Sequence, residues 1–330
     1  MIHSIAVLGA GSWGTAVAIL LARHGVSTCL WGRTGIDVMQ RERCNPRYLP
    51  DRTLPESLLL SEDLAYTVST AKDLVIAVPS HAFELVIKSL QPLIADDARI
   101  AWLSKGLHPE SFQCLDNIVT QYLGDRSMAV LSGPSFAKEV ADNLPTAISL
   151  ASQSKSFAND LIDCFHKGNF RVYYTEDMIG VQLCGAMKNV LAIAVGVSDG
   201  LDLGANARAA LITRGLSEMT RLGLAMGATA ETFVGLAGVG DLILTCTDNQ
   251  SRNRRFGLAL GQGEATQQAE QSIGQVVEGI YNVEQIHALA NQYQLELPIC
   301  ENVYQVIMQK KSPQQAVHDL LAREPLRAVS

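Results

Sequence analysis

The N-terminal stretch IAVLGAGSWGTAVAILLARHG constrains the fold of this chain more than any other segment. A strand-like apolar run is followed by Gly9, Gly11 and Gly14 in G-x-G-x-x-G spacing, and a helical pattern continues from there to Gly25. In such a loop the first glycine permits a tight turn, the second lets the backbone approach a pyrophosphate, and the third lets the helix pack on the strand. The stretch therefore predicts a dinucleotide-binding unit. Its expected cofactor contacts are Gly9, Gly11, Ser12, Trp13 and Gly14.

The rest of the chain shows two different sequence patterns, one before and one after about residue 177. Strand-like runs alternate with helical patterns up to about residue 175, which is typical of a parallel sheet wrapped by helices. Beyond residue 177 the chain is rich in Ala, Leu, Gly and Met at helical spacing, without a convincing strand. We predict a Rossmann-like α/β domain over residues 1–177 and an all-α domain over residues 178–330. The expected strands are SIAVLG, STCLWG, DLVIAVP, RIAWLS, MAVLSGP, TAISLA and RVYYTE.

Composition limits the partners and the compartment. The formal charge is -7, so no global positive field draws the chain to nucleic acid or to an anionic membrane. The seven cysteines are scattered and form no C-x-x-C pair, which favours reduced packing residues over a zinc site or a disulfide framework. The N-terminal apolar run is too short for a signal peptide or a membrane span. We expect a soluble cytoplasmic protein without a bound metal or stable membrane insertion.

The end of the second predicted strand bears on the choice of dinucleotide. In an NAD-specific site an Asp or Glu stands about 20 residues past the glycine loop and binds the ribose hydroxyls. The stretch STCLWGR has no acid there and ends at Arg33, which can meet the 2′-phosphate of NADP. A solvated surface arginine is the alternative for Arg33. NADPH is favoured over NADH, and NADH is not excluded.

The segment GVQLCGAMKNVLAIAVGV carries a lysine in an apolar helical pattern, where an ammonium is costly to bury. Burial would lower the pKa of Lys188 towards the operating pH, as an acid/base residue requires. The alternative is a stem packed in the core with its head reaching solvent. Asp241 also stands in an apolar setting, which predicts pairing with Lys188 completed by Asn189 and Thr245, or else a helix N-cap.

Ten motifs make the chain resemble the bacterial-type NAD(P)-dependent glycerol-3-phosphate dehydrogenases over essentially its whole length. The clearest departure is Ser104, where Thr is more usual before Lys-Gly. The motifs are GAGSWGTA (9–16), NPRYLP (45–50), AVPS (77–80), SKGL (104–107), LSGPSFAKEV (131–140), GAMKNV (185–190), NARAALITRG (206–215), GLAGVGDLILTCT (235–247), SRNRRFG (251–257) and GQVVEG (274–279).

The resemblance implies reversible hydride transfer between a nicotinamide and the pair dihydroxyacetone phosphate and sn-glycerol 3-phosphate, the precursor of the phospholipid backbone. It further implies a helical domain like that of 6-phosphogluconate dehydrogenase, a cleft between the two domains, and a homodimer.

The family pattern also assigns roles to individual residues. Lys188, Asp241 and Lys105 are the expected catalytic residues, and Lys105 would further lower the pKa of Lys188 as a like charge. For Lys105 a solvated loop lysine is the alternative, and Arg254 or Arg255 of SRNRR can belong to a solvated face. The expected substrate contacts are Lys105, Gly133, Ser135, Lys188, Asn189, Asp241, Thr245, Ser251, Arg252 and Asn253. The expected further cofactor contacts are Lys105, Ala137, Arg252, Val276 and Glu278.

Three other functions fit parts of the pattern. A two-domain dehydrogenase of a hydroxy acid, such as hydroxyisobutyrate or ketopantoate, needs fewer anion donors than SRNRR offers. A nonenzymatic NADPH sensor would leave Lys188 and Asp241 structural, and predicts binding without turnover. A methyltransferase accounts for the glycine loop alone. The sequence ranks glycerol phosphate dehydrogenase first.

Overall fold

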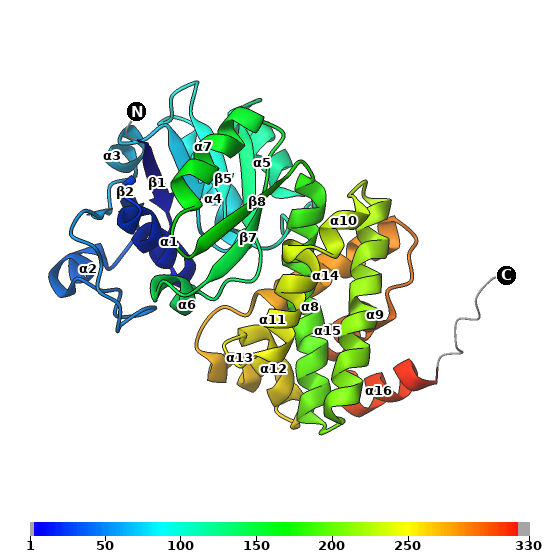
Figure 1. Cartoon of the computed structure of the whole chain (residues 1–330). Coiled ribbons are helices and arrows are strands. Elements are labelled where there is room, and N and C mark those ends of the chain that lie inside the picture. Colours follow the sequence, from blue (N-terminus) through cyan, green and yellow to red (C-terminus); the bar gives the residue numbers. More distant parts are fainter. Residues whose placement is uncertain (1–2, 323–330) are drawn as a thin grey trace.

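The computed structural model describes residues 3–322, and the first half of this range folds around one eight-stranded sheet (Figure 1). The strand order is β3-β2-β1-β4-β5-β6-β7-β8, with β1 near the centre of the parallel part. This order places the loop after β1 where the chain's crossovers change direction, as in a Rossmann-like fold. The strands are β1 (Ser4–Leu8), β2 (Ser27–Trp31), β3 (Leu59–Ser61), β4 (Asp73–Ile76), β5 (Arg99–Trp102), β6 (Met128–Ser132), β7 (Thr146–Ala151) and β8 (Phe170–Thr175).

Two details of the sheet differ from the sequence prediction. The prediction of a parallel sheet is wrong at one junction, because β7 runs antiparallel to β6. The connection between them, residues 133–145, contains only the five-residue helix α6, whereas a crossover between parallel strands usually contains a full helix. Strand β3 was not predicted, since three residues are too few to show an alternating pattern.

Helices cover both faces of this sheet, and the strands alternate their side chains between the two. Val7 and Val75 face a cluster that includes α1 and α7, whereas Leu8 and Ile76 face a cluster that includes α4 and α5. The second cluster continues into the buried face of the helical half. The helices of the first half are α1 (Ser12–Arg23), α2 (Ile36–Glu42), α3 (Leu64–Ser69), α4 (Ser80–Leu90), α5 (Leu115–Leu123), α6 (Ala137–Ala141) and α7 (Lys155–Phe165).

The second half is helical throughout its described part, which ends at residue 322 (Figure 1). Asp177 caps α8, which begins three residues after β8 ends, so the change of sequence pattern near residue 177 coincides with a change of structure. The predicted ranges 1–177 and 178–330 extend at their outer ends beyond the described residues. The helices are α8 (Met178–Gly200), α9 (Gly204–Ala225), α10 (Ala230–Phe233), the π-helix η1 (Leu236–Gly240), α11 (Asp241–Thr247), α12 (Arg252–Gly261), α13 (Thr266–Ile273), α14 (Glu278–Gln292), α15 (Pro298–Met308) and α16 (Pro313–Leu321).

Helix α8 is the core of this half. It is long and apolar enough to cross a membrane by length and composition, but 89% of its most apolar window is buried inside the protein. A second such stretch, Ala230–Thr247, is divided among α10, η1 and α11. Both stretches belong to the packing of the helical half, where neighbouring helices surround α8 (Figure 1).

Glycines bring α8 and α12 into unusually close contact. A Cβ on Gly196 would stand 2.2 Å from the carbonyl oxygen of Arg254, and one on Gly257 would stand 2.2 Å from that of Ile193. Both distances are far below van der Waals contact, so only glycine allows this approach. The seam fixes the start of α12, which carries Arg252 and Asn253, against the helix that carries Lys188.

Candidate active site

The glycine loop has the geometry that a dinucleotide requires. A Cβ on Gly14 would stand 1.9 Å from the carbonyl oxygen of Gly9, so the packing of α1 on the loop depends on glycine. By contrast, no atom lies within 4 Å of the Cβ position of Gly11. Helix α1 begins at Ser12 without a side-chain cap and without an acid in its first turn. The loop therefore fits a pyrophosphate at the helix N-terminus.

Asn45 supports this loop and was not assigned a role from the sequence. Its buried Nδ2 donates to the carbonyl oxygen of Ala10 at 3.0 Å and to Thr15 Oγ1 at 2.8 Å. The residue lies in NPRYLP, a motif that carried the family resemblance only. The hydrophobic periodicity of the sequence does not predict this contact, because it joins residues 35 positions apart.

The charged centre of the site joins the two halves of the protein. Asp241, 1% exposed, accepts from Lys188 Nζ at 2.5 Å through Oδ1 and from Lys105 Nζ at 2.8 Å through Oδ2. Lys188 Nζ also donates to Thr245 Oγ1 at 3.0 Å, and Lys105 Nζ donates to the carbonyl oxygen of Gly133 at 3.1 Å. Lys105 follows β5, whereas Lys188 and Asp241 belong to α8 and α11. One buried carboxylate thus holds two ammonium groups.

Burial and charge set the protonation of this centre. Burial is the largest effect on Lys188 and lowers its pKa, and the positive charge of Lys105 lowers it further. The negative charge of Asp241 raises it, and the resulting pKa of Lys188 is about 8. Burial alone would raise the pKa of Asp241, but the two lysines outweigh it and hold that pKa below its usual range. Lys188 can therefore exchange a proton near neutral pH while Asp241 stays ionised.

The surroundings of Asp241 match the sequence prediction in part. Its pairing with Lys188 and Thr245 is confirmed, but the expected contact with Asn189 is wrong. The N-cap alternative is also wrong, since Gly240 is the N-cap and Asp241 is the first residue of α11. The π-helix η1 directly precedes Asp241, and such insertions are frequent at functional sites.

Asn189 and Asn253 bond to each other. Asn253 Nδ2 donates to Asn189 Oδ1 at 2.9 Å, and Asn253 Oδ1 accepts from the backbone N–H of Gly279 at 2.9 Å. Asn189 Nδ2 donates to the Gly185 carbonyl oxygen and to Asn282 Oδ1. Both N–H groups of Asn189 are therefore used within the protein, whereas Asn253 keeps one N–H for a ligand.

The start of α12 gathers the residues predicted to hold an anion. Ser251 is the N-cap, and its Oγ accepts from the backbone N–H of Arg254. Arg252 Nη1 donates to the carbonyl oxygen of Val276 at 2.7 Å, which brings the GQVVEG segment beside SRNRR. Glu278 opens α14 and is half-buried, and burial raises its pKa against the opposing charges of Arg252 and the two lysines.

The two arginines that follow have different surroundings. Arg254 is buried and pairs with Asp199, so the prediction of a solvated face is wrong for it. The seam between α8 and α12 leaves the Arg254 guanidinium against the end of α8, where Asp199 lies. Arg255 is exposed, as a solvated face requires.

The remaining predicted residues lie on loops at the carboxyl ends of strands. Gly133 and Ser135 follow β6, where Ser135 Oγ donates to the Gly133 carbonyl oxygen at 3.0 Å. Ala137 opens α6 and packs against the same core cluster as Trp13. Arg33 follows β2, is exposed, and has no hydrogen bond or ion pair with another residue of the range 3–322. These positions lie around the same end of the sheet as the glycine loop, which follows the carboxyl end of β1.

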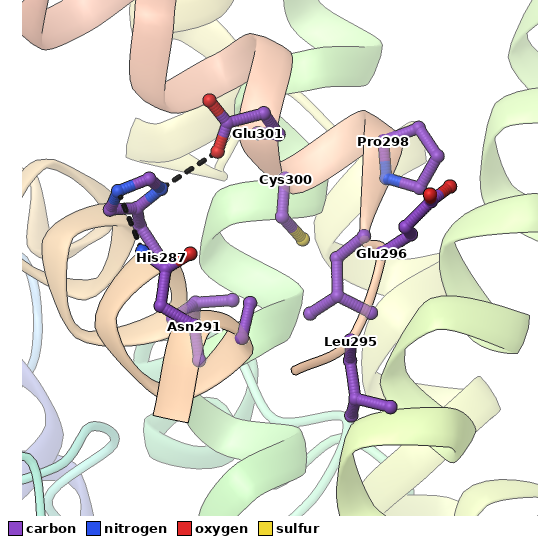
Figure 2. Close-up of a pocket in the computed structure, with 10 residues that line it drawn as sticks. His287, Asn291, Leu295, Glu296, Pro298, Cys300 and Glu301 are labelled. Carbon is purple, nitrogen blue, oxygen red and sulfur yellow. Dashed lines mark hydrogen bonds and ion pairs between the residues drawn. The ribbon is translucent and has the colours of Figure 1, made fainter. Parts of the chain in front are cut away.

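A pocket of about 200 Å³ lies elsewhere, between α14 and α15 (Figure 2). His287 pairs there with Glu301 at 2.7 Å and stacks on Tyr304, and Asn291 bonds to the same imidazole. None of its lining residues belongs to the cluster around Lys188. Within residues 3–322, no group of three or more His, Cys, Asp or Glu side chains converges to hold a metal ion.

Comparisons with known proteins agree on one family. The model described as NAD-dependent glycerol-3-phosphate dehydrogenase N-terminus matches residues 4–158, and the corresponding C-terminus model matches residues 177–318. The chain is 55% identical to a glycerol-3-phosphate dehydrogenase [NAD(P)+] of Colwellia psychrerythraea over 97% of both chains. It is 54% identical to one of Serratia proteamaculans, over 97% of this chain and 96% of the relative.

Solved structures distinguish members of this family from proteins that share only its fold. The crystal structure of glycerol-3-phosphate dehydrogenase from Coxiella burnetii matches with a TM-score of 0.95 at 54% identity, covering 97% of this chain and 99% of that one. A ketopantoate reductase from Ralstonia eutropha matches with a TM-score of 0.61 at 14% identity, covering 96% and 100%, which shows a shared fold alone. This chain is a member of the NAD-dependent glycerol-3-phosphate dehydrogenase family.

Proposed function

We propose that this chain reduces dihydroxyacetone phosphate to sn-glycerol 3-phosphate with NADPH or NADH, and catalyses the reverse oxidation. The observation that carries the proposal is the buried ammonium of Lys188, held 2.5 Å from Asp241 with its pKa lowered to about 8. A bound nicotinamide would supply the hydride. In the reduction, protonated Lys188 donates a proton to the carbonyl oxygen, and in the oxidation its neutral form removes the hydroxyl proton.

Asp241 and Lys105 prepare Lys188 for this exchange. The carboxylate fixes the ammonium through a short hydrogen bond and Thr245 Oγ1 supports it from the next turn of α11. Lys105 balances Asp241, because without a second cation the carboxylate would hold the Lys188 proton more tightly. Arg252 and the free N–H of Asn253 offer charged and neutral donors for a phosphate at the start of α12.

Turnover of matched substrates tests the proposal. We expect rapid cofactor oxidation with dihydroxyacetone phosphate, and little with ketopantoate, whose carboxylate needs fewer donors. Following the nicotinamide absorbance measures both rates. Binding of NADPH, seen by calorimetry, without turnover of dihydroxyacetone phosphate would contradict the enzyme proposal and favour a sensor.

We propose that Arg33 binds the 2′-phosphate of NADPH and thereby sets the cofactor preference. Its guanidinium is exposed beside the glycine-loop edge and without a partner within residues 3–322. For Arg33→Ala we expect the KM for NADPH to rise roughly tenfold or more, because a hydrogen bond to a charged group contributes about 1.5–3 kcal/mol. The KM for NADH should stay unchanged.

The control for Arg33 is Arg41→Ala, which removes another exposed arginine from the neighbouring helix α2. It should leave both KM values unchanged. An equal change of the two KM values in Arg33→Ala would show that the arginine contributes no 2′-phosphate recognition.

We further propose a cytosolic homodimer. All seven cysteines are unpaired, and six of them are buried, which suits a reducing compartment. The homodimer rests on the family resemblance, and the mass in solution from light scattering tests it.

A further inference from the structure

A chain of buried side-chain amides connects the start of α12 to the loop that carries Lys105. It passes through two residues of α14 that the sequence did not single out, Asn282 and Gln285, which are 0% and 1% exposed. The bonds run from Asn253 Nδ2 to Asn189 Oδ1 (2.9 Å), from Asn189 Nδ2 to Asn282 Oδ1 (2.9 Å), from Asn282 Nδ2 to Gln285 Oε1 (3.0 Å), and from Gln285 Nε2 to the Leu107 carbonyl oxygen (3.0 Å).

The direction of these bonds fixes the orientation of each amide. Every Nδ2 or Nε2 donates to the oxygen of the next member, so rotation of one amide by half a turn would place two oxygens or two N–H groups against each other. Leu107 also donates its backbone N–H to Gln285 Oε1 at 3.4 Å. Because buried polar groups that lose their partners are costly, the chain is stable only when all its members are in place.

The two ends of the chain are the two ends of the proposed substrate site. Asn253 lies beside Arg252 at the expected phosphate end. Leu107 lies two residues after Lys105, which contacts Asp241. Between them, a Cβ on Gly106 would stand 3.0 Å from Asn282 Nδ2, so the loop backbone packs directly against the chain.

We infer that Asn282 and Gln285 are positioning residues that hold the Lys105 loop in a fixed place relative to Asn253, so that phosphate binding and the placement of Lys105 beside Asp241 depend on each other. This inference rests on the proposed function. Neither residue touches the charged centre, and each acts through the backbone of the loop or through Asn189.

A loosened Lys105 loop would change the charge beside Lys188, which the loss of a purely structural contact would not. Lys105 is the like charge beside Lys188, and a loosened loop would move it away from Asp241. Lys188 would then share Asp241 with no competitor, and its pKa would rise from about 8. The titratable and charged groups around Lys188 are Asp241 and Cys246 from α11, Lys105 from the loop, and Glu278 from α14, with Arg252 from α12 beside Glu278. Of these, Lys105 alone belongs to the loop that the amide chain holds.

The experiment breaks the chain at two different links and records pH–rate profiles. Asn282→Leu and Gln285→Met are close in size to the native residues and remove the hydrogen bonds. In each folded variant we expect the rising limb of the pH–rate profile for glycerol 3-phosphate oxidation to shift to higher pH by about half a unit or more. This shift follows because loss of a neighbouring like charge raises the pKa of Lys188. We also expect the KM for dihydroxyacetone phosphate to rise several-fold, while the KM for the cofactor stays within twofold.

The control is Asn291→Leu, the same substitution on the exposed side of the same helix, which should leave the profile unchanged. A profile and substrate KM equal to the wild type in either folded chain-breaking variant would overturn the inference, even if thermal stability falls. If the wild type itself leaves dihydroxyacetone phosphate untouched, the proposed function fails instead, so the two failures are distinguishable.

Discussion

Lys188→Ala should lower kcat for dihydroxyacetone phosphate reduction by about 10²–10⁴-fold, the range expected when a positioned acid/base group is removed. Without the ammonium, the only nearby cation bonded to Asp241 is Lys105, among the residues that the structure describes. Lys105 follows a strand of the other half and is tied to the Gly133 carbonyl oxygen, so it does not take the place of Lys188. Steady-state rates with NADPH and NADH measure the loss.

The pH dependence of the wild type gives the same residue a second signature. Oxidation of glycerol 3-phosphate needs neutral Lys188, so its rate should rise with pH through about 8. Reduction needs protonated Lys188, so its rate should fall through the same pH. We therefore expect the oxidation rate to rise and the reduction rate to fall around the same pKa.

The control for Lys188→Ala is Lys155→Ala, which removes a surface lysine paired with Glu176. It should leave kcat unchanged. Retained binding of NADPH by Lys188→Ala, measured by calorimetry, would show that the cofactor half of the site is intact. A kcat within tenfold of the wild type would contradict the acid/base role. Partial recovery of the Ala variant by added methylamine would support it, because the small amine can occupy the emptied space.

Much of the fold follows from short-range pattern. The seven predicted strands are all present, because short apolar and β-branched runs bounded by turn residues are enough to predict a strand locally. The failures have tertiary causes. Strand β3 is too short to carry a period, and the direction of β7 depends on how far α6 can carry the chain across the sheet.

The site was predictable where a residue is chemically out of place in its own segment. Lys188 and Asp241 are charges in apolar helices, and burial requires each to find a partner. Asn189 was assigned to the wrong neighbours because an amide can bond in any direction within reach, and its partners Asn253 and Asn282 lie 64 and 93 residues away. Asn45 and Gln285 were missed for the same reason. Their roles depend on which loop the fold brings to them.

Asp241→Asn should be the most destabilising single substitution in the charged centre. The carboxylate is 1% exposed and bonded to both lysines, so its removal leaves two ammonium groups close together without a counter-charge. Removing one partner from a buried ion pair costs about 3–5 kcal/mol. We expect a loss of that order in the free energy of unfolding near neutral pH, measured in urea, together with a fall in kcat.

The loss should depend on pH in a direction that identifies its cause. Without Asp241 the pKa of Lys188 falls further below the value of about 10.4 that a lysine has in the unfolded chain. Folding at neutral pH then requires release of the Lys188 proton, and that release requires less free energy as pH rises. The deficit of Asp241→Asn relative to the wild type should therefore shrink as pH rises towards about 8 and stay small above it, where folded wild type has released the same proton. Asp199→Asn is the matched control, because it removes a buried carboxylate from Arg254 and Arg208, which remain charged throughout this range. Its deficit should not shrink with pH. Parallel pH curves for the two variants would mean that the repulsion and desolvation of Lys188 do not cause the instability of Asp241→Asn.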